Sequence, residues 1–335
     1  MNEPLFFYSK KPFILENGAV LPEITIAYQT FGTLNSQRNN VIWVVHALTA
    51  NADVSDWWEG LFGKGKFLDP EKYFIVCANN LGSCYGSTYA LSLNPENKEP
   101  YFHQFPLITT RDMANFLEIL RQELNLPQIQ MLLGGSLGGQ IAMEWAILQP
   151  DRIKNLALLA TNASHSPWGI AFNEAQRMAI QADPSWQYAH PQAGMMGLKA
   201  ARAIALLSYR NVEIYNKRQK EEDNSKIDNF KASSYQQYQG EKLIRRFNAF
   251  AYWTLSKAMD SHNVARNRGS FEEALKQIQA KTKIIGISSD LLFPVSEQKF
   301  LAENIANASL HIIDSLYGHD GFLLEFDAIE TILNS

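Results

Sequence analysis

Short, uninterrupted apolar runs that alternate with amphipathic segments are the feature that most constrains the fold of this chain. Runs of this kind are typical of strands buried on both faces, as in a parallel sheet covered by helices. They lie at residues 41–47, 73–79, 130–135, 155–161, 283–289 and 310–314. Helix-period segments lie between several of them, at 110–124, 138–149 and 296–305. This alternation predicts a doubly wound α/β fold with a mostly parallel sheet.

The alternation breaks in the middle of the chain. Residues 164–279 are polar, helical in tendency and rich in Gln, Arg, Tyr and Asn. We therefore expect an α/β core built from residues 1–163 and 280–335, with residues 164–279 inserted as a helical lid. Within the insertion, the segment 217–229 reads KRQKEEDNSKIDN, which predicts a solvated loop.

Composition excludes several classes of function. The 335 residues carry a net charge of −4 and a pI near 6.0, without a basic cluster, which argues against a nucleic-acid partner. The two cysteines, Cys77 and Cys84, form neither a disulfide framework nor a metal-binding spacing. We find no secretory signal and no apolar stretch near the ~20 residues of a membrane helix. These features predict a cytoplasmic protein with no membrane association and no metal site.

One serine lies between a predicted strand and a predicted helix. Residues 134–138 read GGSLG and match G-x-S-x-G, the nucleophile elbow. A strand that turns into a helix within a few residues strains the serine backbone, and larger neighbouring side chains would collide. The turn raises the Ser136 hydroxyl above the sheet, at the positive end of the following helix. The pattern predicts that Ser136 is a nucleophile.

A serine nucleophile needs a base, and the base needs an orienting carboxylate. In an α/β-hydrolase fold these follow the serine in the order Asp, His, each after a strand. Asp290 follows the predicted strand 283–289, and His319 lies in a glycine-flanked loop after the last strand. Asp314 and Asp320 compete with Asp290, but both lie on the segment that carries the histidine. The predicted triad is Ser136, Asp290 and His319.

Two backbone N–H groups are expected to bind the oxyanion that forms during acyl transfer. One belongs to Leu137, the residue after the nucleophile, and the other to Leu48 in the loop 46–51. His46 opens this loop far upstream of the nucleophile. We expect it to pack or to form hydrogen bonds there rather than to act in catalysis.

The sequence resembles the homoserine O-acetyltransferase family from about residue 20 to the C-terminus, the lid included. The resemblance is carried by AYQTFGTLN (27–35), HALT (46–49), NNLGSCYGST (79–88), FPLITTRDM (105–113), GGSLGGQIAMEWA (134–146), YQGEKLIRRFNAFAYWTLSKAMD (238–260), DLLFP (290–294) and YGHDGFLLE (317–325). It implies an α/β-hydrolase fold and transfer of an acetyl group from acetyl-CoA, through the serine, to L-homoserine in methionine biosynthesis. It also implies a homodimer formed through the lid helices, and acetyl-CoA as a co-substrate rather than a bound cofactor.

The resemblance implies two substrate ligands. Segment 197–210 is similar to the family's lid segment whose first arginine, here Arg202, binds the amino acid's carboxylate, with Arg210 as the nearest rival. A guanidinium suits a carboxylate because it donates two parallel hydrogen bonds. Asp320, directly after His319, would receive the substrate's ammonium.

The chain departs from the family pattern at two places. Ala50 and Asn51 replace a Gly-Asp pair, and Tyr89 and Ala90 replace Gly-Pro. We expect both segments to border the acyl pocket or its entrance. The alternatives are a transferase that uses succinyl-CoA or L-serine, an esterase or thioesterase with the same triad, and a non-catalytic binding protein of this fold.

Overall fold

One eight-stranded sheet forms the centre of the computed structural model, which describes residues 3–335. Its strand order is β1-β4-β6-β5-β7-β8-β9-β10. The six strands from β6 to β10 in this order run parallel, whereas β4 and β1 add an antiparallel edge. The strands are β1 (Leu5–Ser9), β4 (Ile24–Phe31), β5 (Val41–Val45), β6 (Phe74–Ala78), β7 (Met131–Gly135), β8 (Asn155–Leu159), β9 (Lys281–Ile287) and β10 (Ala308–Ile313), with β2 (Phe13–Ile14) and β3 (Val20–Leu21) as a separate pair. The mostly parallel α/β sheet predicted from the apolar runs is confirmed.

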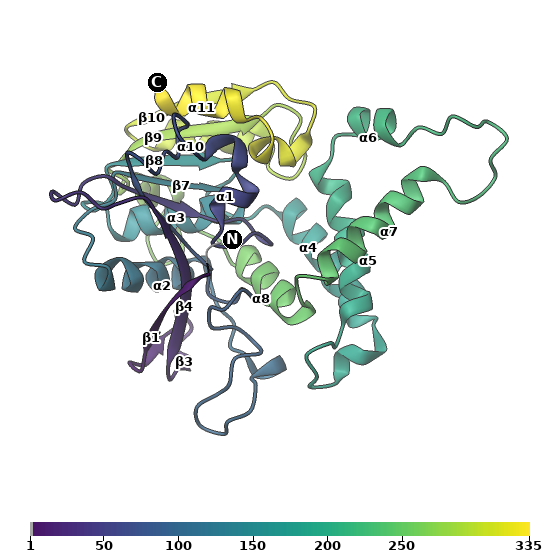
Figure 1. Ribbon diagram of the computed structural model, residues 1–335, viewed down its shortest axis with the longest axis horizontal. Helices are drawn as coiled ribbons and strands as arrows, with labels where there is room; N and C mark the ends of the chain where they lie inside the picture. Colours follow the sequence, from purple (N-terminus) through teal and green to yellow (C-terminus); the bar gives the residue numbers. More distant parts are fainter. Residues whose placement is uncertain (1–2) are drawn as a thin grey trace.

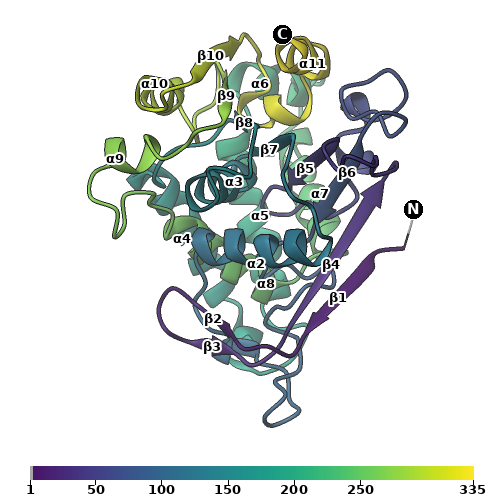
Figure 2. The same cartoon turned by 90° about the vertical axis from the view of Figure 1, so that its left-hand side faces the viewer.

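Helices cover both faces of the sheet, which explains why its central strands lack polar residues. All five residues of β5 are buried, with Trp43 and Val45 in one core cluster and Ile42 and Val44 in the other. The first cluster packs under α2, α3 and α10, and Figure 2 shows α2 beside α3. The second cluster packs under α1 and α11. These helices are α1 (Val54–Trp57), α2 (Thr110–Glu123), α3 (Leu137–Leu148), α10 (Val295–Asn304) and α11 (Phe326–Asn334).

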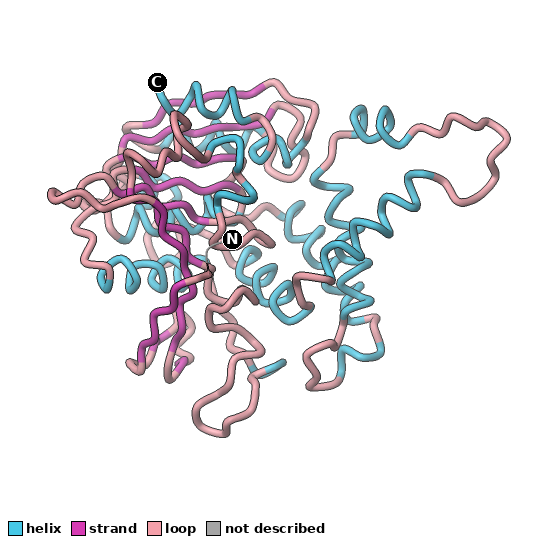
Figure 3. Tube along the Cα trace, in the orientation of Figure 1, coloured by secondary structure: helices cyan, strands magenta, loops and turns pink. Residues whose placement is uncertain are grey.

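Five helices between β8 and β9 extend away from the sheet (Figure 1). Helix α5 packs against both α4 and α7. Figure 3 shows these helices on one side of the molecule and the strands on the other. They are α4 (Pro167–Gln181), α5 (Met195–Tyr209), α6 (Val212–Gln219), α7 (Lys231–Ile244) and α8 (Ala249–Asp260), and α9 (Phe271–Leu275) leads back to the sheet. Residues 217–219 of the predicted loop belong to α6, whose Asn211 side chain caps the first turn.

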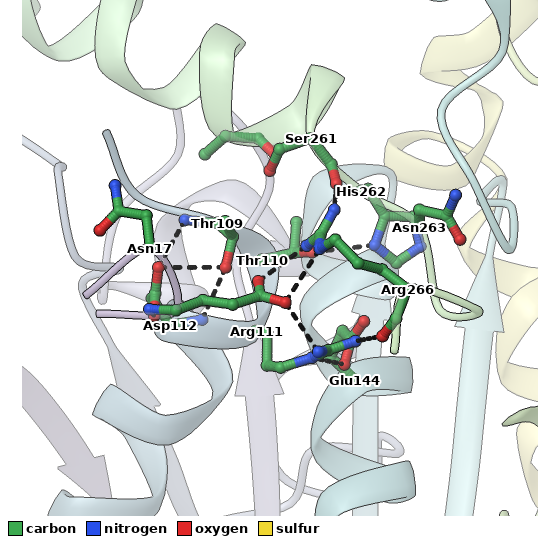
Figure 4. A network of polar contacts seen from close by, with 12 residues as sticks. Asn17, Thr109, Thr110, Arg111, Asp112, Glu144, Ser261, His262, Asn263 and Arg266 are labelled. Carbon is green, nitrogen blue, oxygen red and sulfur yellow. Dashed lines mark hydrogen bonds and ion pairs between the residues drawn. The ribbon is translucent and has the colours of Figure 1, made fainter. Parts of the chain in front are cut away.

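A network of partly buried ion pairs joins the end of this helical region to the core (Figure 4). Arg266, which follows α8, pairs with Glu16 at 2.8 Å. Glu16 also pairs with Arg111 of α2 at 2.7 Å, and Arg111 reaches Glu144 of α3 at 3.2 Å. Because these pairs connect α2, α3 and the segment after α8, the network helps to fix where the chain re-enters the core. Among residues 3–335, no helix is long and apolar enough to cross a bilayer.

Candidate active site

Ser136 lies on a sharp turn between β7 and α3. Its backbone φ of 56° and ψ of −126° fall in a region that side-chain-bearing residues rarely adopt. A Cβ added to Gly134 would lie 2.3 Å from the carbonyl oxygen of Gly138, and one added to Gly138 would lie 2.2 Å from the carbonyl oxygen of Val45. Only glycine fits at these two positions. The small residues around Ser136 therefore allow the strand, the turn and the helix to pack closely.

Ser136, His319 and Asp290 form a continuous chain of hydrogen bonds. Nε2 of His319 lies 2.9 Å from Oγ of Ser136, and Nδ1 lies 2.7 Å from Oδ2 of Asp290. Asp290 follows β9, and His319 lies in the short helix η4 (Gly318–Leu323) after β10. The three residues meet because the carboxyl ends of parallel strands share one edge of the sheet. The exposed fractions of the three residues are 5% or less, so these hydrogen bonds are shielded from bulk water.

Asp290 is held in the orientation that an imidazole partner requires. Its second oxygen, Oδ1, accepts hydrogen bonds from the backbone N–H groups of Leu292 (2.8 Å) and Phe293 (2.9 Å). An ionised carboxylate only accepts hydrogen bonds, so Nδ1 of His319 carries a proton and Nε2 presents its lone pair to Ser136. Phe293 also stacks on the His319 ring at 5.0 Å between centroids, which fixes the plane of the ring.

The two rival aspartates are engaged elsewhere. Asp314 accepts a hydrogen bond from the Ser288 hydroxyl at 2.9 Å. Oδ2 of Asp320 lies 2.8 Å from Nη1 of Arg210. Asp290 is thus the carboxylate that contacts His319.

The two N–H groups predicted to bind an oxyanion lie near the Ser136 hydroxyl. Leu137 begins α3 directly after the serine, and Leu48 lines the same cavity as Ser136. Within residues 3–335, neither N–H donates to another protein group. Donors left over in a polar pocket are suited to stabilising a developing negative charge.

His46 holds the loop that carries Leu48. Its Nε2 accepts the backbone N–H of Asn80 at 3.0 Å, and its Nδ1 lies 2.8 Å from the carbonyl oxygen of Ala47. Complete burial lowers the pKa of His46 to about 4, so the ring is neutral at pH 7. A neutral ring can accept one bond and donate the other, which agrees with a hydrogen-bonding role in this loop.

Ser136 and His319 open into a cavity of about 530 Å³ whose wall includes residues of α5 and α7. Arg202 of α5 and Asp320 both line this cavity, as the two predicted substrate ligands should. The Arg202 guanidinium lies 5.5 Å from the ring centroid of Tyr209. Arg210, the rival of Arg202, is not among the lining residues and instead pairs with Asp320.

The two departures from the family pattern lie in different surroundings. Ala50 and Asn51 line the cavity, as expected. Tyr89 and Ala90 are not among the residues that line it, so their place at its entrance stays a prediction. Ala90 packs instead in a small apolar cluster with Phe250. Just before Tyr89 and Ala90, the hydroxyls of Thr88 and Ser87 accept hydrogen bonds from backbone N–H groups of β4.

Glu297 is a carboxyl group close to the site that could not be predicted from the sequence. Oε2 of Glu297 on α10 accepts a hydrogen bond from Asn162 at 3.0 Å, and Asn162 accepts one from Gln140 of α3 at 2.9 Å. Burial, reinforced by the negative charge of Asp290, raises the pKa of Glu297 to about 7. A glutamate in the first turn of a helix gives no sequence signal of such burial, because this position is usually solvated.

The fold and the site define a protein of the α/β-hydrolase class, and the profile of the alpha/beta hydrolase fold matches residues 40–326. A homoserine O-acetyltransferase from Cyclobacterium marinum is 49% identical over 98% of this chain and 93% of its own length. This chain belongs to the homoserine O-acetyltransferase family.

Solved structures agree with this placement. A homoserine O-acetyltransferase from Bacillus anthracis superposes with a TM-score of 0.90 at 25% identity, covering 100% of this chain and 98% of that chain. Esterase E22 shares the fold with a TM-score of 0.89 at 21% identity, covering 99% of each chain. The fold alone therefore accommodates proteins with different names, and the function must be argued from the site.

Proposed function

We propose that this chain transfers an acetyl group from acetyl-CoA to the side-chain hydroxyl of L-homoserine through an acyl-Ser136 intermediate, in methionine biosynthesis. The observation that carries the proposal is the hydrogen-bonded chain from Ser136 to Asp290, which opens into one cavity with Arg202 and Asp320. The 49% identity to a homoserine O-acetyltransferase supports the choice of acceptor.

In the first half-reaction, Ser136 attacks the thioester carbonyl while Nε2 of His319 removes the hydroxyl proton. The N–H groups of Leu48 and Leu137 bind the oxyanion, and one such donor is worth about 3 kcal/mol of barrier. Collapse of the tetrahedral intermediate breaks the carbon–sulfur bond. His319 returns its proton to the departing thiolate, which leaves as CoA with its thiol restored.

In the second half-reaction, homoserine binds with its carboxylate at Arg202 and its ammonium at Asp320. His319 removes the proton from the homoserine hydroxyl, whose oxygen attacks the acyl-serine carbonyl. The serine leaves with the proton from His319, so the enzyme returns to its starting state and O-acetyl-homoserine is released.

The acceptor must compete with water for the acyl-serine. A well-oriented bound acceptor can reach effective molarities of roughly 10⁵–10⁸ M, far above the concentration of water. We propose that residues 164–279 act as the lid that supplies this orientation, because α5 contributes Arg202 to the cavity wall. Exclusion of water by the lid would add to the same preference.

The test is a matrix of donors and acceptors. Acetyl-CoA and succinyl-CoA are each combined with L-homoserine, L-serine or buffer alone, and CoA release and ester formation are measured. We expect rapid turnover only with acetyl-CoA and homoserine. Equal CoA release in buffer alone would identify a thioesterase, and a preference for succinyl-CoA or serine would identify another transferase of this family.

We further propose a homodimer formed through the lid helices and a cytoplasmic location. Met196 and Leu207 of α5 are 64% and 58% exposed, and Tyr238 of α7 is 60% exposed, so apolar surface is available on these helices. Both cysteines, Cys77 and Cys84, are free thiols, which suits a reducing compartment. Sedimentation of the parent and of a Leu207→Glu variant tests the dimer.

A further inference from the structure

Two cations of the lid face the same cavity as the candidate nucleophile, and neither has a carboxylate partner within residues 3–335. Lys242 lies in the last turn of α7, and Arg246 follows two residues after its end. Both are exposed. Both side chains line the same cavity although Arg246 lies in the turn after the helix.

Arg246 is held at the cavity by neutral oxygen atoms of the core rather than by a carboxylate. Its Nη1 donates hydrogen bonds to the carbonyl oxygen of Thr49 and to the hydroxyl of Tyr85, the latter at 2.6 Å. Thr49 lies next to Leu48 in the loop that supplies one candidate oxyanion donor. The guanidinium therefore keeps its positive charge uncompensated at the wall of the cavity.

The two parts of the proposed donor have different requirements for water. Its thioester must reach Ser136, which is 5% exposed. Its phosphate groups cannot follow, because removing a charged group from water is strongly unfavourable without a partner. The phosphates are therefore expected to stay where water reaches them, and Lys242 and Arg246 are exposed cations on the cavity wall.

We propose that Lys242 and Arg246 bind the phosphate groups of the acyl-CoA donor, and so select a phosphate-bearing thioester over a simple one. This inference rests on the proposed function, since it takes the donor to be an acyl-CoA. Arg202 is distinct from this pair, because it lies on α5 against Tyr209 and is the proposed ligand of the acceptor's carboxylate.

The kinetic test compares acetyl-CoA with S-acetyl-N-acetylcysteamine, which carries the same thioester but no phosphate. An unscreened contact between single charges at a wet surface is worth about 1 kcal/mol, or roughly a fivefold change in binding. Lys242→Met should therefore lower kcat/KM for acetyl-CoA relative to the short thioester by roughly fivefold. Added salt should reduce this ratio more in the parent than in the variant.

The control is Arg245→Met, which removes an exposed cation beside the pair that does not line the cavity. It should leave the donor ratio unchanged. An equal loss with both donors in Lys242→Met would overturn the inference in favour of a structural role. A rise in KM for homoserine alone would also overturn it, because the cations would then serve the acceptor.

A binding measurement keeps this inference separate from the proposed function. Calorimetric titration with CoA should show roughly fivefold weaker binding to Lys242→Met than to the parent, while pantetheine binds both proteins equally. Unchanged CoA affinity would overturn the inference even if homoserine is acetylated. Failure of the parent to acetylate homoserine would overturn the proposed function instead, and CoA affinity would still decide the role of Lys242.

Discussion

Oδ2 of Asp320 lies 2.8 Å from Nη1 of Arg210, so the residue after the candidate catalytic histidine is ion-paired to the end of α5. Arg210 is the rival of Arg202 for the carboxylate-binding role, but its guanidinium is already paired with Asp320. Arg202 on the same helix lines the cavity and has no ion-pair partner in residues 3–335. The geometry therefore favours Arg202 as the group that binds a substrate carboxylate.

Replacing Arg202 by Lys should raise KM for homoserine by about tenfold or more. Lysine keeps the charge but cannot donate two parallel hydrogen bonds to a carboxylate, and 1.4 kcal/mol corresponds to a factor of ten. Stopped-flow measurement of the first CoA released should show an unchanged first half-reaction. If Arg202→Lys slows the burst as strongly as the steady state, Arg202 does not bind the acceptor. Arg245→Lys is the matched control.

Replacing Asp290 by Asn should lower kcat by about 10⁴-fold, the loss known for the same change in serine proteases. The asparagine amide can donate to Nδ1 and so favour the tautomer of His319 that cannot accept the Ser136 proton. Thermal unfolding should change little, since the side chain keeps its shape. Asp314→Asn is the control and should retain activity. A variant pair in which Asp314→Asn is the inactive one would contradict the assignment.

Replacing Gly138 by Ala should destabilise the protein strongly, by roughly 3 kcal/mol or more, because its Cβ would lie 2.2 Å from the backbone oxygen of Val45. Gly18 has a φ of 85° and open space around it, so Gly18→Ala should lose only the ~1–2 kcal/mol of a left-handed backbone. Urea unfolding of both variants measures the difference. Equal stability of the two would show that the elbow tolerates a side chain.

Replacing Glu297 by Gln should stabilise the protein at pH 8 relative to the parent, with little difference near pH 5. The pKa of Glu297 is raised from 4.5 to about 7 in the folded state, mainly by burial. The favourable contribution of this protonated carboxyl group to the free energy of unfolding is fully present below pH 4.5 and is lost as pH rises through about 7. The side-chain amide of Asn162 can still donate its hydrogen bond to the side-chain oxygen of a glutamine at position 297. Melting temperatures from pH 5 to 8 test this, and a difference independent of pH would refute it.

The triad could be predicted from the sequence because it depends on local order. Ser136, Asp290 and His319 each follow a strand of the parallel part of the sheet, and parallel strands bring their carboxyl ends together. The glycines around Ser136 indicated a tight turn, because larger side chains would collide there. Both features can be recognised without knowing how residues 164–279 fold.

Contacts that depend on packing of the insertion could not be predicted. The Arg210–Asp320 pair joins α5 to η4, and the position of Lys242 at the cavity depends on how α7 lies against the core. The bonds that join Thr88 and Ser87 to β4, just before Tyr89, are also tertiary contacts without a sequence signal. Glu297 gave no signal, because only tertiary burial distinguishes it from a solvated helix residue.

The most direct test of the central claim is the mass of the intact protein after brief mixing with acetyl-CoA, followed by peptide mapping. We expect one added acetyl group on the peptide that contains Ser136, its removal on addition of L-homoserine, and no label in Ser136→Ala. A Ser136→Ala protein that still gains the acetyl group, or a parent that transfers acetyl to homoserine without ever carrying it, would contradict the account.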